Sequence, residues 1–279
     1  MEHRAGGYLF LGQVAFCPSH GHTEAMKHVY SVVMLIASVC VASSAEAISG
    51  MGAEDSAYLQ KHLPGLIQGP SDSPPITKSS DYLPLKETNY VFVRPSGAEV
   101  TISMKPSDRS PGEPVGTKSG GWRLESVQGP TRYIRVDDEG ARPGLVIPTD
   151  VSKTRALITR HNPPEPLLIE GVDKESWEMG LKIYDLHDPS VLAHSGTLTV
   201  DWADLGSWRV KTPAGEFSTR LIRVKYDGKI SAASVTGIRY TFYAPNVGPV
   251  AFTDAREVSA MLVYHDDSDH AGVLKSLPK

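Results

Sequence analysis

The sequence predicts a mainly β protein, built as a curved antiparallel sheet or half barrel with one N-terminal helix. From Thr88 onward, short apolar runs of strand length alternate with Gly, Pro, Asn and Asp, which is typical of antiparallel strands and turns. Helical spacing is confined to residues 53–67. Corners such as Tyr-Ala-Pro-Asn-Val-Gly at 243–248 would let a sheet curve. No fixed-period repeat is present, which disfavours a solenoid or a propeller.

Residues 26–47 have the features of a secretory signal peptide. Met26 and Lys27 precede an apolar run at 32–41, and Ala45-Glu46-Ala47 forms a small-residue cleavage site. The run is shorter than the about 20 apolar residues that a transmembrane helix needs. We therefore expect translation to start at Met26, cleavage after Ala47, and a periplasmic mature chain without a transmembrane segment.

Both cysteines, Cys17 and Cys40, precede the predicted cleavage site. The mature chain would then lack a disulfide, a cysteine-ligated metal and a cysteine nucleophile. Cys40 lies near the end of the apolar run and leaves lipidation open as an alternative, although Val39 stands where a small residue is expected. The net charge of -4 argues against a nucleic-acid partner.

Residues 48–86 are predicted to form a helix and a flexible arm. Leu59, Leu63 and Ile67 recur at helical spacing, and Pro64 among them would break or kink the helix. The following Gln-Gly-Pro-Ser-Asp-Ser-Pro-Pro stretch is rich in residues typical of loops. We expect the arm to extend to residue 86.

Residues 87–279 are predicted to form the β domain, with about ten to twelve strands. The clearest hairpin spans residues 89–106, where Pro-Ser-Gly supplies the turn. The His-Asn-Pro-Pro-Glu-Pro stretch at 161–166 suggests a boundary between two β-rich halves. In the second half, Thr-Pro-Ala-Gly at 212–215 and Tyr-Asp-Gly-Lys at 226–229 are predicted turns of an antiparallel meander.

Residues 239–252 begin as an alternating strand and then reach a Pro and Gly corner. Tyr240 and Phe242 share one face, Pro245 removes a ladder donor, and Gly248 tolerates unusual dihedral angles. The pattern predicts two strands joined by a bend.

The two stretches 210–228 and 238–252 resemble the TapB-type family of bacterial periplasmic proteins of unknown function. The residues that carry the resemblance are Pro213, Ala214, Gly215, Phe217, Tyr240, Phe242, Ala244, Pro245, Val247, Gly248 and Val250. This sequence departs from the family pattern at Pro249, where an aliphatic residue is usual. Such proteins are similar in outline to periplasmic lipoprotein carriers, so the resemblance implies a curved sheet around an apolar groove. It gives Pro213, Gly215, Phe217, Pro245 and Gly248 structural roles.

Four aromatic residues are the candidates for ligand contact: Trp202, Trp208, Tyr240 and Phe242. They would line an apolar groove, and the alternative is that they belong to the core. Lys211, Arg220, Arg223 and Lys225 form a possible basic strip, for which a solvated surface is the better interpretation.

Two polar clusters are weighed as chemical sites. The tail at 264–272 gathers His265, Asp266, Asp267, Asp269 and His270, which we interpret as a solvated acidic turn and not as a metal site. Residues 185–208 contain His187, Asp188, His194, Ser195, Asp201 and Asp204, but the chain has no Gly-x-Ser-x-Gly elbow. We therefore assign no catalytic residue, metal or cofactor.

The leading functional hypothesis is a non-enzymatic periplasmic binding or carrier module for a lipid or another apolar small molecule. An envelope adaptor that binds a partner protein through sheet edges or through the arm is the alternative. A hydrolase is the third hypothesis.

Overall fold

The computed structural model describes residues 48–108, 111, 121–127, 129–260 and 264–278. The predicted signal peptide lies outside these residues. The described part contains two helices, α1 (Ala53–His62) and α2 (Ser79–Tyr82), and the thirteen strands β1 (Ile67–Pro70), β2 (Thr88–Val93), β3 (Glu99–Ser107), β4 (Gly121–Ser126), β5 (Thr131–Asp137), β6 (Gly144–Ser152), β7 (Leu157–Ile169), β8 (Lys174–Asp185), β9 (Leu192–Thr212), β10 (Gly215–Ile230), β11 (Ala233–Ala244), β12 (Gly248–Ala260) and β13 (Tyr264–Ser276). The mainly β prediction with an N-terminal helix is confirmed.

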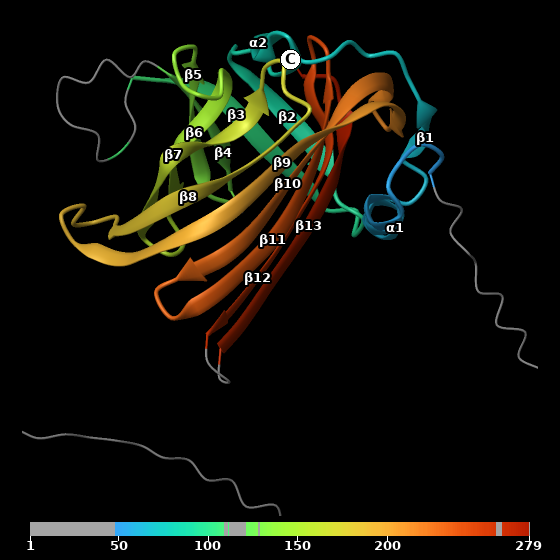
Figure 1. Ribbon diagram of the computed structural model, residues 1–279. Helices are drawn as coiled ribbons and strands as arrows, with labels where there is room; N and C mark the ends of the chain where they lie inside the picture. Colours follow the sequence, from blue (N-terminus) through green and yellow to red (C-terminus); the bar gives the residue numbers. More distant parts are fainter. Residues whose placement is uncertain (1–47, 109–110, 112–120, 128, 261–263, 279) are drawn as a thin grey trace, which may run out of the picture. The chain divides into compact units, whose positions relative to one another are not determined.

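Twelve of the described strands close into an antiparallel barrel (Figure 1). The order runs β9-β10-β11-β12-β13-β2-β3-β4-β5-β6-β7-β8, and β8 then pairs with β9 again. Closure depends on the length of β9, which spans 21 residues. Its first part pairs with β8 and its last part pairs with β1, while β10 lies along its other edge. The predicted curvature of the sheet is therefore confirmed, and the sheet closes into a complete barrel.

Contacts between distant strands identify the inner face of the barrel. Arg239 on β11 reaches Glu165 on β7, and Arg132 on β5 reaches Asp254 on β12. These strands are not neighbours in the sheet, so the contacts cross the lumen. Because successive side chains on a strand point to opposite faces, Tyr240 next to Arg239 points outward.

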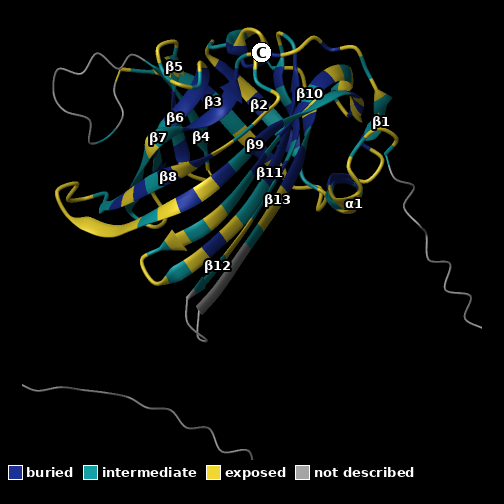
Figure 2. Ribbon diagram, in the orientation of Figure 1, coloured by how far each residue is buried: buried dark blue, intermediate teal, exposed yellow. Residues whose placement is uncertain are grey.

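The barrel is buried on both faces along part of β11. All of residues 239–244 are buried, so the expected half-buried strand is covered inside and outside. Figure 2 shows that burial is concentrated in the part of the barrel near α2, whereas the far ends of β8 to β12 are mostly intermediate or exposed.

Helix α1 covers the outer face of β10 and β11. It ends at His62, two residues before Pro64, as the proline predicts. Leu59 is 1% exposed, and the Tyr58 ring lies 5.1 Å from the Tyr240 ring. The helix therefore forms a second layer of the core.

The segment predicted as a flexible arm is packed against the barrel. β1 pairs with β9, and Ile76, Tyr82 and Leu83 are at most 3% exposed. The Pro- and Ser-rich composition gives no direct sign of this, because its few apolar residues are widely spaced. Burial of these apolar side chains supplies the free energy that holds the segment against the barrel.

Two other sequence interpretations were wrong. Residues 161–166 do not divide the chain into two halves, because they lie inside β7 of the single closed sheet. Residues 226–229 do not form a turn but lie inside β10, which pairs on both sides there, and the turn comes at Ser231. The turn at 212–215 and the bend at 245–247 are confirmed.

Gly248 shows why the bend after β11 requires glycine. Its φ is +103°, and a Cβ placed on it would lie 2.6 Å from the Tyr90 hydroxyl oxygen. Asn246 in the same bend also has a positive φ of 60°. Asn and Gly are the residues that adopt such angles at lowest cost, so the Asn-Val-Gly sequence fits this bend.

Candidate functional site

A hollow of about 340 Å³ lies on the outer side of the barrel, where the end of α1 meets β13 and the β2–β3 turn. Its lining consists of His62, Leu63, Pro64, Gly65, Leu66, Val93, Arg94, Pro95, Lys211, Gly272 and Val273. The volume is at the lower end of the range for small-molecule sites. Pro64 shapes it, because α1 ends at His62 just before this proline and the chain then turns back toward β1.

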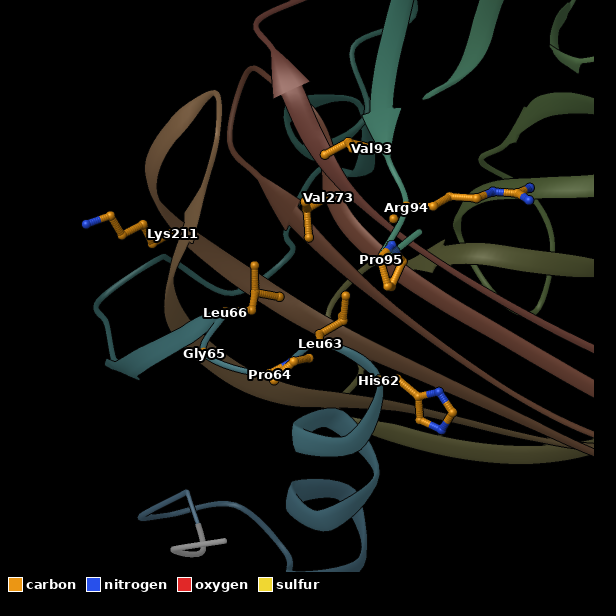
Figure 3. Close-up of a pocket in the computed structure, with 11 residues that line it drawn as sticks. His62, Leu63, Pro64, Gly65, Leu66, Val93, Arg94, Pro95, Lys211 and Val273 are labelled. Carbon is orange, nitrogen blue, oxygen red and sulfur yellow. The ribbon is translucent and has the colours of Figure 1, made fainter. Parts of the chain in front are cut away.

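The centre of the hollow is apolar and its margins are basic. In Figure 3, Leu63, Leu66, Val273 and Pro95 point toward one another, whereas the ends of Arg94 and Lys211 extend away on opposite sides. Leu63 and Leu66 are buried, and Lys211 is 65% exposed beside Glu216. Such a surface suits an apolar group that carries an anionic end.

His62 joins the hollow to the barrel wall. Its Nδ1 lies 3.1 Å from Oδ2 of Asp269 on β13, and its ring stacks on Tyr58. These contacts hold the last turn of α1 in place, and with it the floor made by Leu63.

The lumen contains a cluster of charged residues. Glu165 is 5% exposed and accepts two hydrogen bonds on Oε1, from Tyr226 Oη at 2.7 Å and from Arg239 Nη2 at 2.6 Å. Arg132 donates to Asp254 at 3.3 Å. The cluster thus pairs its cations and anions across the barrel, as buried charges require.

The charges of this cluster set its pKa values. Burial alone would raise the pKa of Glu165, but Arg239, with help from His161, Arg132 and the Tyr226 hydroxyl, holds that pKa well below its usual value. Burial raises the pKa of Tyr226, which therefore remains a neutral donor to Glu165. Glu165 is an anion fixed by two donors.

Asp150 differs from Glu165 in its surroundings. Burial raises the pKa of Asp150, and His161 and Arg132 oppose this only in part. Its Oδ1 atom is buried and makes no hydrogen bond within the described residues. One ligand atom each of Asp150, His161 and Glu165 lie within 4.8 Å of one another, so these residues could hold a metal ion.

The aromatic residues predicted to contact a ligand do not line the outer hollow. Trp202 is 0% exposed in the lumen, and Trp208 donates its Nε1–H to the Leu205 carbonyl at 3.0 Å. Tyr240 and Phe242 are buried on the outer face of β11. Ligand contact for these four residues stays a prediction.

The five residues to which the resemblance gives structural roles stand at turns or near the start of a strand. Pro213 and Gly215 make the β9–β10 turn, where Gly215 has a φ of +136°, and Phe217 pairs with Val210 just after it. Pro245 and Gly248 stand in the bend after β11.

The basic strip is divided among separate ion pairs. Arg223 pairs with Asp55 at 2.8 Å and Lys225 with Glu54 at 3.2 Å, both on α1, while Arg220 pairs with Asp204 at 2.8 Å. Arg220 and Arg223 are therefore not the solvated residues that we expected. Arg220 and Arg223 pair with the buried carboxylates of Asp204 and Asp55, and the sequence pattern does not predict these contacts.

The two polar clusters weighed in the sequence lie in β structure. The tail at 264–272 is part of β13, paired with β12, and not a turn. The side chains of residues 260–267 are not among those that the structure describes. Asp269 forms an ion pair with His62. Among the triad candidates, Asp204 pairs with Arg220, Asp188 accepts from Ser190, and His194 lies 3.3 Å from Ser231.

Sequence reasoning missed His161, Glu165 and Asp150. The signal was the His-Asn-Pro-Pro-Glu-Pro stretch at 161–166, where a histidine and a glutamate flank prolines. Because prolines usually interrupt strands, this stretch by itself predicts a boundary and not a site.

Comparisons with known proteins give a fold-level likeness only. No family model and no curated protein matches the chain, so the resemblance to the TapB-type family stays a prediction. Among solved structures, the chain is similar to a protein from Bacteroides fragilis described as a "putative exported protein with YmcC-like fold", at 14% identity and a TM-score of 0.34 over 69% of this chain and 94% of that one. A "putative lipoprotein" from Parabacteroides distasonis matches at 14% identity and a TM-score of 0.32, over 74% of this chain and 100% of the other. At these values the likeness carries no argument about function.

None of the described helices is long and apolar enough to cross a bilayer.

Proposed function

We propose that this chain is an exported periplasmic protein that binds or carries an apolar small molecule, such as a lipid with an anionic end. The observation that carries the proposal is the outer hollow, with an apolar centre and the cations Arg94 and Lys211 at its margins. The signal-peptide pattern at 26–47 supports export.

The alternative of an adaptor that pairs through sheet edges has less support. Barrel closure still leaves unpaired edges among the described strands, including β1, the parts of β7 and β8 beyond the Asn162–Gly180 pair, and β13 before Val273. That part of β7 contains Pro163, Pro164 and Pro166, which cannot donate ladder hydrogen bonds. The segment at 68–86, which the adaptor hypothesis needs as a flexible arm, is packed against the barrel.

Filling the hollow tests the proposal directly. Val93 lines it and is only partly buried, so a Val93→Trp substitution should occupy the space without disturbing the lumen. The matched control is Val127→Trp, because Val127 is 92% exposed and does not line the hollow.

The readout is fluorescence of the apolar probe N-phenyl-1-naphthylamine, followed by displacement with a fatty acid. We expect the wild type and Val127→Trp to bind the probe, and Val93→Trp to lose at least about tenfold in affinity, which is about 1.4 kcal/mol. Equal affinity of all three proteins for the probe would show that the outer hollow is not the binding site, and this result would overturn the proposal. Native mass spectrometry of the periplasmic protein should show a co-purified lipid, whereas a co-purified polypeptide would favour the adaptor.

A further inference from the structure

The register of β6 and β7 brings Asp150, His161 and Glu165 together. Ile147 pairs with Glu165 and Thr149 pairs with Arg160, so residues 161–164 have only Pro148 opposite them. These four residues form an irregular bulge in β7. Bulges of this kind re-aim side chains, and here His161 and Glu165 are directed to the same place beside Asp150 on β6.

His161 is held in one tautomer. Its Nδ1 lies 3.0 Å from the carbonyl oxygen of Ile147, which can only accept a hydrogen bond. Nδ1 therefore carries the proton when the ring is neutral, and Nε2 keeps its lone pair. A backbone carbonyl that orients the ring in this way is the usual support of a metal-binding histidine.

The two carboxylates each have an oxygen to offer. Among the described residues, the two hydrogen bonds that fix Glu165 both end on Oε1, and its second oxygen can take another partner. Oδ1 of Asp150 is buried without a hydrogen bond in the described part of the chain. A buried oxygen without a partner is costly, and a cation would remove that cost.

The arginines of the lumen have carboxylate partners of their own. Arg239 binds Glu165 Oε1, and Arg132 binds Asp254. Arg256 acts on Asp150 from farther out, and its own side chain is exposed. These cations weaken the attraction for a metal ion, but none of them takes the buried Asp150 oxygen.

We propose that Asp150, His161 and Glu165 form a binding site for one divalent transition-metal ion inside the barrel. One imidazole nitrogen and two carboxylate oxygens form a set that suits Zn²⁺, with a fourth position left open. The site is separate from the outer hollow, because it lies on the opposite face of the sheet.

Titration of the metal-free, untagged periplasmic protein with ZnCl₂ by calorimetry tests this site. We expect one equivalent to bind, and His161→Gln and Asp150→Asn each to weaken binding by at least about tenfold. His194→Gln is the matched control, because His194 is exposed near Ser231 and outside the cluster. It should bind as the wild type does.

Two results would overturn the proposal. One is absence of Zn²⁺ binding by the wild type, and the other is unchanged binding by His161→Gln, which would point to other histidines. Near-ultraviolet circular dichroism checks that each variant folds. If both variants unfold, the ¹⁵N resonances of the wild-type histidines decide, because Zn²⁺ must shift the His161 Nε2 signal and an unshifted signal sinks the idea.

Discussion

Asp55 on α1 accepts two hydrogen bonds from the guanidinium of Arg223 on β10, at 2.8 and 2.9 Å, and so fastens the helix to the barrel wall. It also accepts a hydrogen bond from Tyr240 Oη at 2.6 Å. Burial and the nearby Asp55 carboxylate both raise the pKa of Tyr240 above its usual value. The helix, β10 and β11 thus meet at one carboxylate.

Asp55→Asn should lower the free energy of unfolding by about 3 kcal/mol, because the buried Arg223 loses its counter-charge. The neighbouring Glu54→Gln is the control, since Glu54 is 79% exposed beside Lys225. Its loss should stay below about 0.5 kcal/mol. Urea denaturation measures both, and equal losses would show that the Asp55 pair contributes no more than a surface pair.

Gly248→Ala should be more destabilising than Gly97→Ala. Both glycines have a positive φ, +103° and +82°, but only the new Cβ at 248 meets another atom, the Tyr90 hydroxyl oxygen at 2.6 Å. We expect a loss of about 1 kcal/mol at Gly97 and about 2 to 4 kcal/mol at Gly248. Thermal unfolding compares the two, and equal losses would mean that β2 moves freely away from the bend.

Tyr90→Phe should stabilise the protein at neutral pH by about 1 kcal/mol, because the Tyr90 hydroxyl is buried without a partner among the described residues. Tyr82→Phe is the matched control. Its hydroxyl contacts Ser73 Oγ at 3.1 Å and donates to the Pro74 carbonyl, so its removal should cost about 1 kcal/mol. Equal effects of the two substitutions in urea denaturation would refute the contrast.

Tyr90 also predicts a pH dependence. Burial raises its pKa from the ordinary 10 to about 12. Between these values the folded state keeps a proton that the unfolded state has lost, so stability is full below pH 10 and falls as pH rises toward 12. The wild type should lose roughly 2 to 3 kcal/mol more than Tyr90→Phe over this range. Parallel pH profiles of the two proteins would contradict this assignment.

Arg239→Met should lower the free energy of unfolding by about 3 to 5 kcal/mol, since it leaves the Glu165 carboxylate buried without its cation. Adding Glu165→Gln should restore part of the loss, because no unpaired charge then remains in the lumen. Lys211→Met is the surface control, with its Nζ 3.9 Å from Glu216 and its side chain 65% exposed. A double variant no more stable than Arg239→Met would show that the loss comes from packing alone.

The sequence by itself determined the strands, the helix that stops before Pro64, and the bend around Gly248. These features depend on near neighbours, through alternation, proline geometry and glycine dihedral angles, so a local pattern is enough to predict them. The same local rule misled at 161–166, where prolines that usually end a strand instead form a bulge within one.

Only the tertiary structure decided that the sheet closes, that the arm packs, and that Asp150, His161 and Glu165 meet in the lumen. Closure depends on the pairing of β8 with β9 together with eleven other ladders around the ring, and no short stretch records which strand edges will meet. Asp55 and Arg223 lie 168 residues apart, and Tyr240 and Asp55 lie 185 residues apart. Their contact arises from the packing free energy of the whole chain, and for this reason the candidate sites were visible only in three dimensions.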